Sequence, residues 1–306
     1  MSAPVAAPVA TVMGSEGGVY SLAIDGGAEV QATLRGRLKQ DVKRGDRIVV
    51  GDRVEVMEEE GAFTVEALLP RKSTMIRSGG RRVRVLAANV DRVFLVVAVE
   101  PAPWPQMMDR LLVVAAASDM PVVIVFNKVD LPGADTVLGP LVARYRAAGY
   151  PVLTVSAKQA IGVEALRALA CQGTSAFMGP SGVGKSTLLN VIEPGLLLRT
   201  SELSLKGRTG RHTTVSSRLI PLTCGGAVAD TPGFSDVGAC EVDAAELDLC
   251  FPEMRERRDE CRFGGCSHVK EPGCAVREAL EEGLIAPERY DSYVVLRSEA
   301  MAARER

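Results

Sequence analysis

Several features that define other protein classes are scarce in this chain of 306 residues. Aromatic residues make up only 4%, with a single Trp, and there are only two His. Lys and Arg number 36 against 38 Asp and Glu, so the formal net charge is −2. This balance excludes a globally basic nucleic-acid binder but leaves room for local basic patches. No apolar run reaches the roughly 18 residues that a membrane span requires.

The N-terminus lacks the basic start and the long apolar run of a secretory signal. We predict a short, floppy Ala/Pro arm over residues 1–14 and a cytoplasmic location. Seven cysteines, an odd number scattered along the chain, argue against a disulfide framework and for a reducing compartment. Four of them are therefore expected to be buried apolar residues, namely Cys171, Cys224, Cys240 and Cys250.

Short β-like segments separated by Gly-containing turns fill residues 15–68. Five closely spaced strands of this kind predict a small barrel or a sandwich. An oligonucleotide-binding barrel is one option, and the spacing alone does not choose between them. The candidate strands are Val19–Ile24, Glu29–Leu34, Arg47–Val50, Arg53–Val56 and Phe63–Leu69.

From about residue 91 the pattern changes to continuous apolar runs that alternate with helical stretches. Runs rich in β-branched residues are typical of strands buried on both faces of a parallel sheet. The alternation predicts a helix-flanked parallel sheet, and the chain after about residue 237 is helical in pattern. The expected strands are Val93–Val99, Val122–Phe126, Val152–Val155 and Ser175–Met178, and the expected helices lie near 105–118, 135–148, 162–171 and 187–192.

The strongest motif fits G-x-x-x-x-G-K-[ST] and lies between a short apolar strand and a helix. Its glycines let backbone N–H groups converge on phosphate oxygens at a helix N-terminus. Lys185 supplies a positive charge for the β- and γ-phosphates, and the Ser186 hydroxyl is placed to ligate Mg²⁺. The phosphate loop comprises Gly179, Pro180, Ser181, Gly182, Val183, Gly184, Lys185, Ser186 and Thr187.

A second motif indicates which base is bound. Asn127-Lys128-Val129-Asp130 follows a buried strand, at the edge where open α/β sheets bind ligands. The Asp130 carboxylate accepts from the two N–H groups on the N1/N2 edge of guanine, which adenine does not offer. The weaker Ser156-Ala157-Lys158 element, after the next strand, offers a backbone N–H to guanine O6.

Candidate ligands for Mg²⁺ and the γ-phosphate lie later in the chain. Asp230-Thr231-Pro232-Gly233 follows the apolar segment 227–229, so Asp230 holds the Mg²⁺ water shell and the Gly233 N–H meets the γ-phosphate. Either Thr213 or Thr214 completes the shell, and the pattern does not say which. The alternative for residues 204–214 is a solvated basic loop.

A Cys₃His set predicts a zinc site near the C-terminus. Three thiolates and one imidazole suit tetrahedral Zn²⁺, and four protein ligands leave no open position for catalysis. The site is thus structural; the alternative is a set of unrelated reduced thiols. Its ligands are Cys261, Cys266, His268 and Cys274.

Basic residues cluster in three places. Such patches suit phosphate contact, although a solvated surface explains them equally well on sequence alone. Because aromatics are scarce, backbone or shape recognition of RNA is favoured over base stacking. The clusters are Arg71, Lys72, Arg77, Arg81, Arg82 and Arg84; the stretch 35–47; and Arg255, Arg257 and Arg258.

The guanine motif precedes the phosphate loop here, which is a circularly permuted order. With Gly51-Asp52-Arg53-Val54, Ala88-Asn89-Val90-Asp91 and the Cys-rich end, the chain resembles the bacterial GTPase family that depends on the small ribosomal subunit. The resemblance implies an oligonucleotide-binding barrel at 1–70, a permuted GTPase domain at 71–236 and a zinc-binding helical module at 237–306. It further implies 30S and 16S rRNA as partners.

The resemblance also implies a departure in the hydrolytic residue. Many switch GTPases place Gln directly after D-x-x-G, but Phe234 stands there and cannot orient water. The family is thought to use a switch His, which corresponds to His212; the alternative is an exposed or RNA-facing His.

We therefore predict an α/β enzyme, a monomer that hydrolyses GTP with Mg²⁺, is stimulated by the 30S subunit and acts late in its assembly. One rival is a nucleotide-gated RNA-binding module for translation control whose hydrolysis is incidental. Another is a kinase-like enzyme that transfers phosphate to a small acceptor. Because the C-terminal module follows the γ-phosphate-sensing segment directly, we also expect hydrolysis to shift it relative to the barrel.

Overall fold

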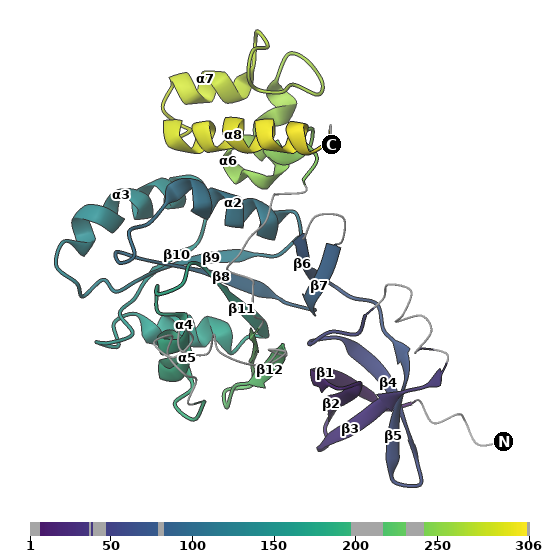
Figure 1. Ribbon diagram of the computed structural model, residues 1–306. Coiled ribbons are helices and arrows are strands. Elements are labelled where there is room, and N and C mark those ends of the chain that lie inside the picture. Colours follow the sequence, from purple (N-terminus) through teal and green to yellow (C-terminus); the bar gives the residue numbers. More distant parts are fainter. Residues whose placement is uncertain are drawn as a thin grey trace, which may run out of the picture.

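The protein consists of a small β-barrel, a helix-flanked sheet and a helical module (Figure 1). The computed structural model describes residues 7–36, 38, 47–78, 83–196, 217–230 and 242–304. Within these ranges, no helix combines the length and the apolar character needed to cross a membrane.

Five strands form the N-terminal barrel. Their order is β1-β2-β3-β5-β4, and pairing between β1 and β4 closes the barrel. This closed five-stranded arrangement fits the oligonucleotide-binding fold and decides between the options that the sequence leaves open. Its interior is filled by residues such as Val12, Leu22 and Val54, all fully buried. The strands are β1 (Val9–Glu16), β2 (Val19–Ile24), β3 (Glu29–Leu34), β4 (Arg53–Glu59) and β5 (Ala62–Leu68).

Two predictions for this region are wrong. Residues 9–14 belong to strand β1 rather than to a floppy arm, because Ala10 and Val12 fill the barrel interior and the strand pairs on both sides. The segment Arg47–Val50 is not a strand: only Val50 makes an isolated bridge, to Ala87 outside the barrel.

The second unit is a six-stranded sheet in the order β10-β9-β8-β11-β13-β12. All neighbours are parallel except β12 and β13, which form an antiparallel hairpin. The predicted parallel strands are therefore confirmed, while the hairpin partner β12 was not predicted. The strands are β8 (Arg92–Ala98), β9 (Val122–Asn127), β10 (Val152–Thr154), β11 (Thr174–Met178), β12 (Arg218–Pro221) and β13 (Ala227–Asp230).

Helices cover both faces of this sheet (Figure 1). Helices α2 (Pro105–Ala116) and α3 (Ala134–Ala147) pack on one face, and α4 (Val163–Ala170) and α5 (Lys185–Ile192) pack on the other. Side chains of β8 alternate between the two cores, with Leu95 in the first and Phe94 in the second. Burial on both faces is why these strands are continuously apolar.

The barrel is joined to the sheet by β1, which pairs with β12 through Gly14 and Arg218. A separate hairpin, β6 (Thr74–Ser78) with β7 (Val83–Ala88), follows the barrel and was not predicted. Asp52 anchors this junction: it is fully buried and accepts from Arg71 Nε at 2.7 Å.

The C-terminal module packs against helix α2. Phe251 and Leu296 of the module share one core with Val113 of α2. As predicted, the part of the module that the structure describes holds no strand. Its elements are η2 (Leu247–Cys250), α6 (Pro252–Arg255), η3 (Arg258–Glu260), α7 (Ala275–Glu281) and α8 (Pro287–Arg304).

A buried arginine fixes the module to the helix-flanked sheet. Arg289 of α8, 1% exposed, donates to Asp109 of α2 at 2.6 Å and to Glu253 of α6 at 2.7 and 3.1 Å. Its guanidinium lies 4.5 Å from the centroid of the Phe251 ring, and the Tyr145 hydroxyl donates to Asp109. Each buried carboxylate therefore has a positively charged partner, and the single guanidinium serves both.

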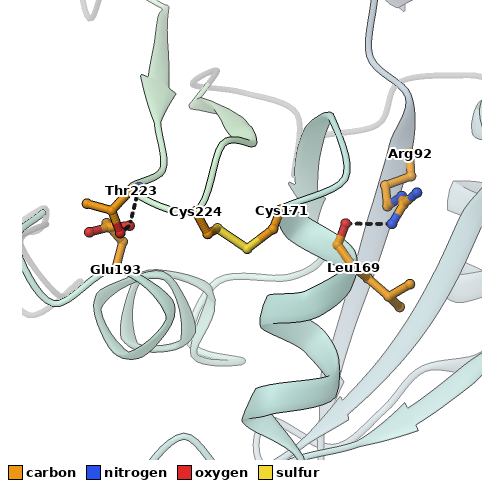
Figure 2. Close-up of a disulfide and its surroundings, with 6 residues drawn as sticks. All are labelled: Arg92, Leu169, Cys171, Glu193, Thr223 and Cys224. Carbon is orange, nitrogen blue, oxygen red and sulfur yellow. Dashed lines mark hydrogen bonds between the residues drawn. A yellow bond between two sulfur atoms is a disulfide. The ribbon is translucent and has the colours of Figure 1, made fainter.

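A disulfide joins Cys171, directly after α4, to Cys224 in the turn between β12 and β13 (Figure 2). Cys224 is exposed and Cys171 half-buried, so the prediction that both are buried, unpaired residues is wrong. The fold brings together two residues that lie 53 positions apart, which cysteine spacing alone does not reveal. Cys250 is buried as predicted, and Cys240 lies outside the described residues.

Candidate functional site

The phosphate loop follows β11 and leads into α5. Three of its glycines, Gly179, Gly182 and Gly184, have positive φ angles of 138°, 84° and 98°. A Cβ at Gly179 would lie 2.1 Å from the carbonyl oxygen of Val96. Only glycine therefore allows this loop to curl tightly above the end of the sheet.

Lys185 lies inside the loop. Its Nζ donates to the carbonyl oxygens of Gly179 at 2.6 Å and Pro180 at 2.8 Å. Burial lowers the pKa of Lys185 to about 8. Ser186, the next residue, is half-buried in the first turn of α5. The loop thus presents an ammonium group, a hydroxyl and a helix N-terminus at one place, which suits a phosphate chain with Mg²⁺.

The guanine motif lies directly against the phosphate loop. The Asn127 side chain, 1% exposed, donates from Nδ2 to the Val183 carbonyl at 2.9 Å. Lys128 Nζ donates to the Gly182 carbonyl at 2.7 Å. A Cβ at Gly184 would lie 2.4 Å from Asn127 Nδ2, so this contact also requires glycine. The two motifs, about fifty positions apart in sequence, therefore form one site.

The second predicted base-binding element, Ser156-Ala157-Lys158, lies against the guanine motif. Ser156 Oγ donates to Asp130 Oδ1 at 2.6 Å, and the Ala157 N–H donates to Asn127 Oδ1 at 3.3 Å. Ser156 is fully buried, and its hydroxyl also accepts from the Gln159 N–H at 3.0 Å. These bonds fix the orientation of both Asp130 and Asn127. Lys158 is exposed, and Val129 is half-buried.

Asp230 is the last residue of β13. Because β13 runs parallel to its neighbour β11, Asp230 lies at the same end of the sheet as the phosphate loop that follows β11. Partial burial raises the pKa of Asp230, and Arg218, opposite it in the hairpin, acts against this. Four predicted site residues lie outside the described residues: His212, Thr213, Thr214 and Gly233.

The predicted metal ligands come together in the C-terminal module. One ligand atom from each of four residues lies within 4.8 Å of the others. His268 Nδ1 lies 3.3 Å from Cys274 Sγ and 3.6 Å from Cys261 Sγ, so this ring nitrogen faces the centre. A donor set of three sulfur atoms and one imidazole nitrogen fits a closed tetrahedral site. The four residues are Cys261, Cys266, His268 and Cys274.

The residues that hold His268 in place were not predicted. Its Nε2 lies 3.2 Å from Asp248 Oδ2, a buried carboxylate that also pairs with Arg258. The backbone of His268 has a φ of 60°, and the Tyr290 hydroxyl donates to its carbonyl oxygen at 2.7 Å. No local pattern reveals Asp248 and Tyr290, because each lies about twenty positions from the histidine.

Some residues of the predicted RNA-binding clusters have intramolecular partners. Arg71 pairs with buried Asp52, Arg35 pairs with Glu66, and Arg258 pairs with Asp248. The positive charge of these three residues is therefore already paired within the protein. The side chains of Arg77, Arg81, Arg82 and Arg84 lie outside the described residues.

Comparison with known proteins shows which family has this combination of features. The family model described as RsgA GTPase matches residues 68–240, more than half of the chain. The chain belongs to the RsgA GTPase family. Two relatives carry the name "Small ribosomal subunit biogenesis GTPase RsgA". The one from Gemmatimonas aurantiaca is 44% identical over 95% of this chain and 96% of its own length; the one from Moorella thermoacetica is 42% identical over 95% and 93%.

Two solved structures have the same fold as this chain. YjeQ from Thermotoga maritima matches with a TM-score of 0.81 and 34% identity over 96% of this chain and 98% of its own. YloQ, described as a circularly permuted GTPase, matches with a TM-score of 0.76 and 31% identity over 97% and 96%. The permuted GTPase fold is therefore confirmed, and the chain is a GTP-hydrolysing enzyme.

GTP binding should depend on pH through Lys185. The phosphates of GTP favour the charged lysine, so binding raises a pKa that lies at about 8 in the free protein. Above that pH, affinity should fall by about tenfold per pH unit, and binding should take up close to one proton near pH 9 but almost none near pH 7. Calorimetry in buffers of different ionisation enthalpy measures this uptake.

A Lys185→Arg variant is the matched control, because guanidinium stays charged throughout this range. It should show no such proton uptake, whatever its affinity. Equal uptake by both proteins near pH 9 would contradict the assignment to Lys185.

Proposed function

We propose that this GTPase acts in late assembly of the small ribosomal subunit, in the cytoplasm and as a monomer, by binding 16S rRNA. Its hydrolysis is stimulated by the 30S particle. The observation that carries the nucleotide part is the bond from Asn127 to Val183, which joins the guanine motif to the phosphate loop. The ribosomal part is supported by relatives that are named for small-subunit biogenesis and match nearly the full chain.

In this proposal the bound GTP lies along the carboxyl ends of β9, β10, β11 and β13. Asp130 accepts from the N1/N2 edge of guanine, and the Ala157 region lies near O6. Lys185 neutralises charge on the β- and γ-phosphates. Mg²⁺, held by Ser186 and by water bound to Asp230, neutralises more of that charge, and either Thr213 or Thr214 completes its shell.

The hydrolytic residue in this proposal is His212, whose imidazole orients the attacking water. Phe234 stands where many GTPases have Gln and has no group to do so. The Gly233 N–H contacts the γ-phosphate.

We further propose that the Cys₃His cluster binds Zn²⁺. Zinc would supply a structural cross-link in a module that has a small core of its own. The three thiolates and His268 Nδ1 hold the ion, and Asp248 orients the imidazole through Nε2.

Asp248→Asn should weaken zinc binding by about tenfold or more, because it removes the negative charge that supports His268. Transfer of zinc to a chromogenic chelator measures the effect. Asp259→Asn changes an exposed carboxylate nearby and should transfer zinc at the wild-type rate. Equal rates for all three proteins would rule out a role for Asp248 in holding the metal.

The decisive test of function is the GTPase rate with added 30S, 50S or 70S particles, with ATP as the control substrate. We expect slow turnover of GTP alone, a marked increase with 30S and no turnover of ATP. His212→Ala should lose the 30S-stimulated rate and keep GTP binding. Equal turnover with and without 30S would favour the alternative hypothesis, in which the protein is a nucleotide-gated RNA-binding module and its hydrolysis is incidental.

A further inference from the structure

The disulfide encloses the phosphate-binding part of the chain in a covalent ring. Cys171 follows the last residue of α4, and Cys224 lies in the turn of the β12–β13 hairpin (Figure 2). The phosphate loop and the whole of α5 lie between them in sequence. The same hairpin ends at Asp230. One sulfur–sulfur bond therefore links the elements on which the proposed GTP site is built.

The hairpin turn is also held by contacts that do not depend on the disulfide. Glu193, directly after α5 and only 7% exposed, accepts from the Thr223 N–H at 2.8 Å and from Thr223 Oγ1 at 2.9 Å (Figure 2). The neighbouring Gly226 packs so closely that a Cβ there would lie 2.1 Å from the Ala170 carbonyl. Opening the disulfide thus removes a tether and leaves the turn packed.

The disulfide is accessible from solvent. Among the described cysteines, Cys224 is the exposed one, while Cys250 and Cys274 are buried. Exposed disulfides exchange readily with external thiols, whereas buried structural ones do not. In a reducing compartment, disulfides that do form are most often transient ones.

We propose that Cys171 and Cys224 form a reversible thiol–disulfide exchange site that controls how fast nucleotide leaves. The reductant is a dithiol. One of its thiolates attacks Cys224 Sγ, the sulfur–sulfur bond breaks, and its electron pair leaves on Cys171, which takes up a proton. The second thiol of the reductant then displaces Cys224, which also ends as a thiol. The reductant becomes a disulfide, and an oxidised dithiol or glutathione disulfide reverses the exchange.

The covalent ring closed by Cys171 and Cys224 determines in which direction the disulfide should change the rate of nucleotide release. In this proposal, nucleotide leaves through a local opening of the phosphate site in which α5 and the hairpin separate from α4. A cross-link lowers the chain entropy of such open states, so it makes them rarer. Nucleotide should therefore leave slowly from the oxidised protein and faster from the reduced one. This inference rests on the proposed nucleotide site at the phosphate loop.

The experiment measures dissociation of a fluorescent GDP analogue from the full-length, zinc-loaded protein. One sample is oxidised with glutathione disulfide, and the other is reduced with dithiothreitol and then desalted. Alkylation followed by mass measurement counts the free thiols. We expect two additional thiols, on Cys171 and Cys224, and about three- to tenfold faster dissociation after reduction.

Two variants complete the test. The double variant Cys171→Ser/Cys224→Ser should release the analogue at the fast rate after either treatment, which also accounts for any effect of the reagents on the metal ligands. Thr223→Val keeps the disulfide and should still respond to reduction.

Three results would overturn the proposal: equal rates in both redox states, no gain of two thiols in the native protein, or a double variant that still responds to the reagents. Failure of the analogue to bind at all would instead refute the nucleotide site itself, and with it the control of release.

Discussion

Asp130→Asn should weaken GTP binding by about 100-fold, because the amide replaces the acceptor that matches the two donors on guanine. The same variant should gain affinity for xanthosine triphosphate, whose base carries a carbonyl oxygen in place of the amino group at C2. That oxygen suits the amide NH₂ of the new side chain. Competition against a fluorescent nucleotide gives both affinities, and ATP should bind neither protein.

The matched control is Ser156→Ala, which removes the hydroxyl that donates to Asp130 Oδ1 and leaves the carboxylate in place. It should weaken GTP binding about tenfold without any gain for xanthosine triphosphate. If Asp130→Asn leaves the preference for GTP unchanged, base recognition lies elsewhere and the nucleotide site proposed above is refuted.

Arg289→Ala should release the C-terminal module from helix α2. The change leaves the buried carboxylates of Asp109 and Glu253 without their positively charged partner, which costs about 3–5 kcal/mol. We expect a separate, earlier unfolding transition for the module in urea, followed by tryptophan fluorescence and hydrogen exchange. Trp104, an exposed residue directly before α2, reports on this region.

Arg144→Ala provides a matched control at the rim of the same interface. Arg144 of α3 pairs with Glu288 of α8, whose side chain is about half exposed. Such pairs contribute about 0–1 kcal/mol, so this variant should unfold close to the wild type. A single, unshifted transition in Arg289→Ala would show that the apolar contacts alone hold the module in place.

The parts of the fold that depend on local pattern were predictable from the sequence. Strands buried on both faces are continuously apolar, which is why β8, β9 and β11 were expected where they occur. The phosphate loop carries its glycines at fixed spacing because only glycine fits beside Val96 and Asn127. The Cys₃His cluster was likewise visible because its ligands lie close together in sequence.

Features that depend on distant partners were not predictable. The sequence of β1 resembles a floppy arm because its residues are mostly small, and only the barrel core shows that Ala10 and Val12 are buried. The sequence does not predict the disulfide because the fold, rather than the spacing, brings Cys171 to Cys224. In the sequence, Arg289 is one of several charges on a polar helix. Only the packing of α8 against α2 shows that it donates to the buried carboxylate of Asp109.

Helix α2 comes early in the chain, yet its outer face is covered by residues near the end. Arg289 donates to Asp109 of this helix, and Leu296 lies in the same hydrophobic core as Val113. During synthesis, a nascent chain that already contains both the guanine motif and the phosphate loop still exposes this apolar strip. A partly folded chain in which α8 has not yet docked therefore exposes apolar surface on α2, and such surface makes a folding intermediate prone to aggregation.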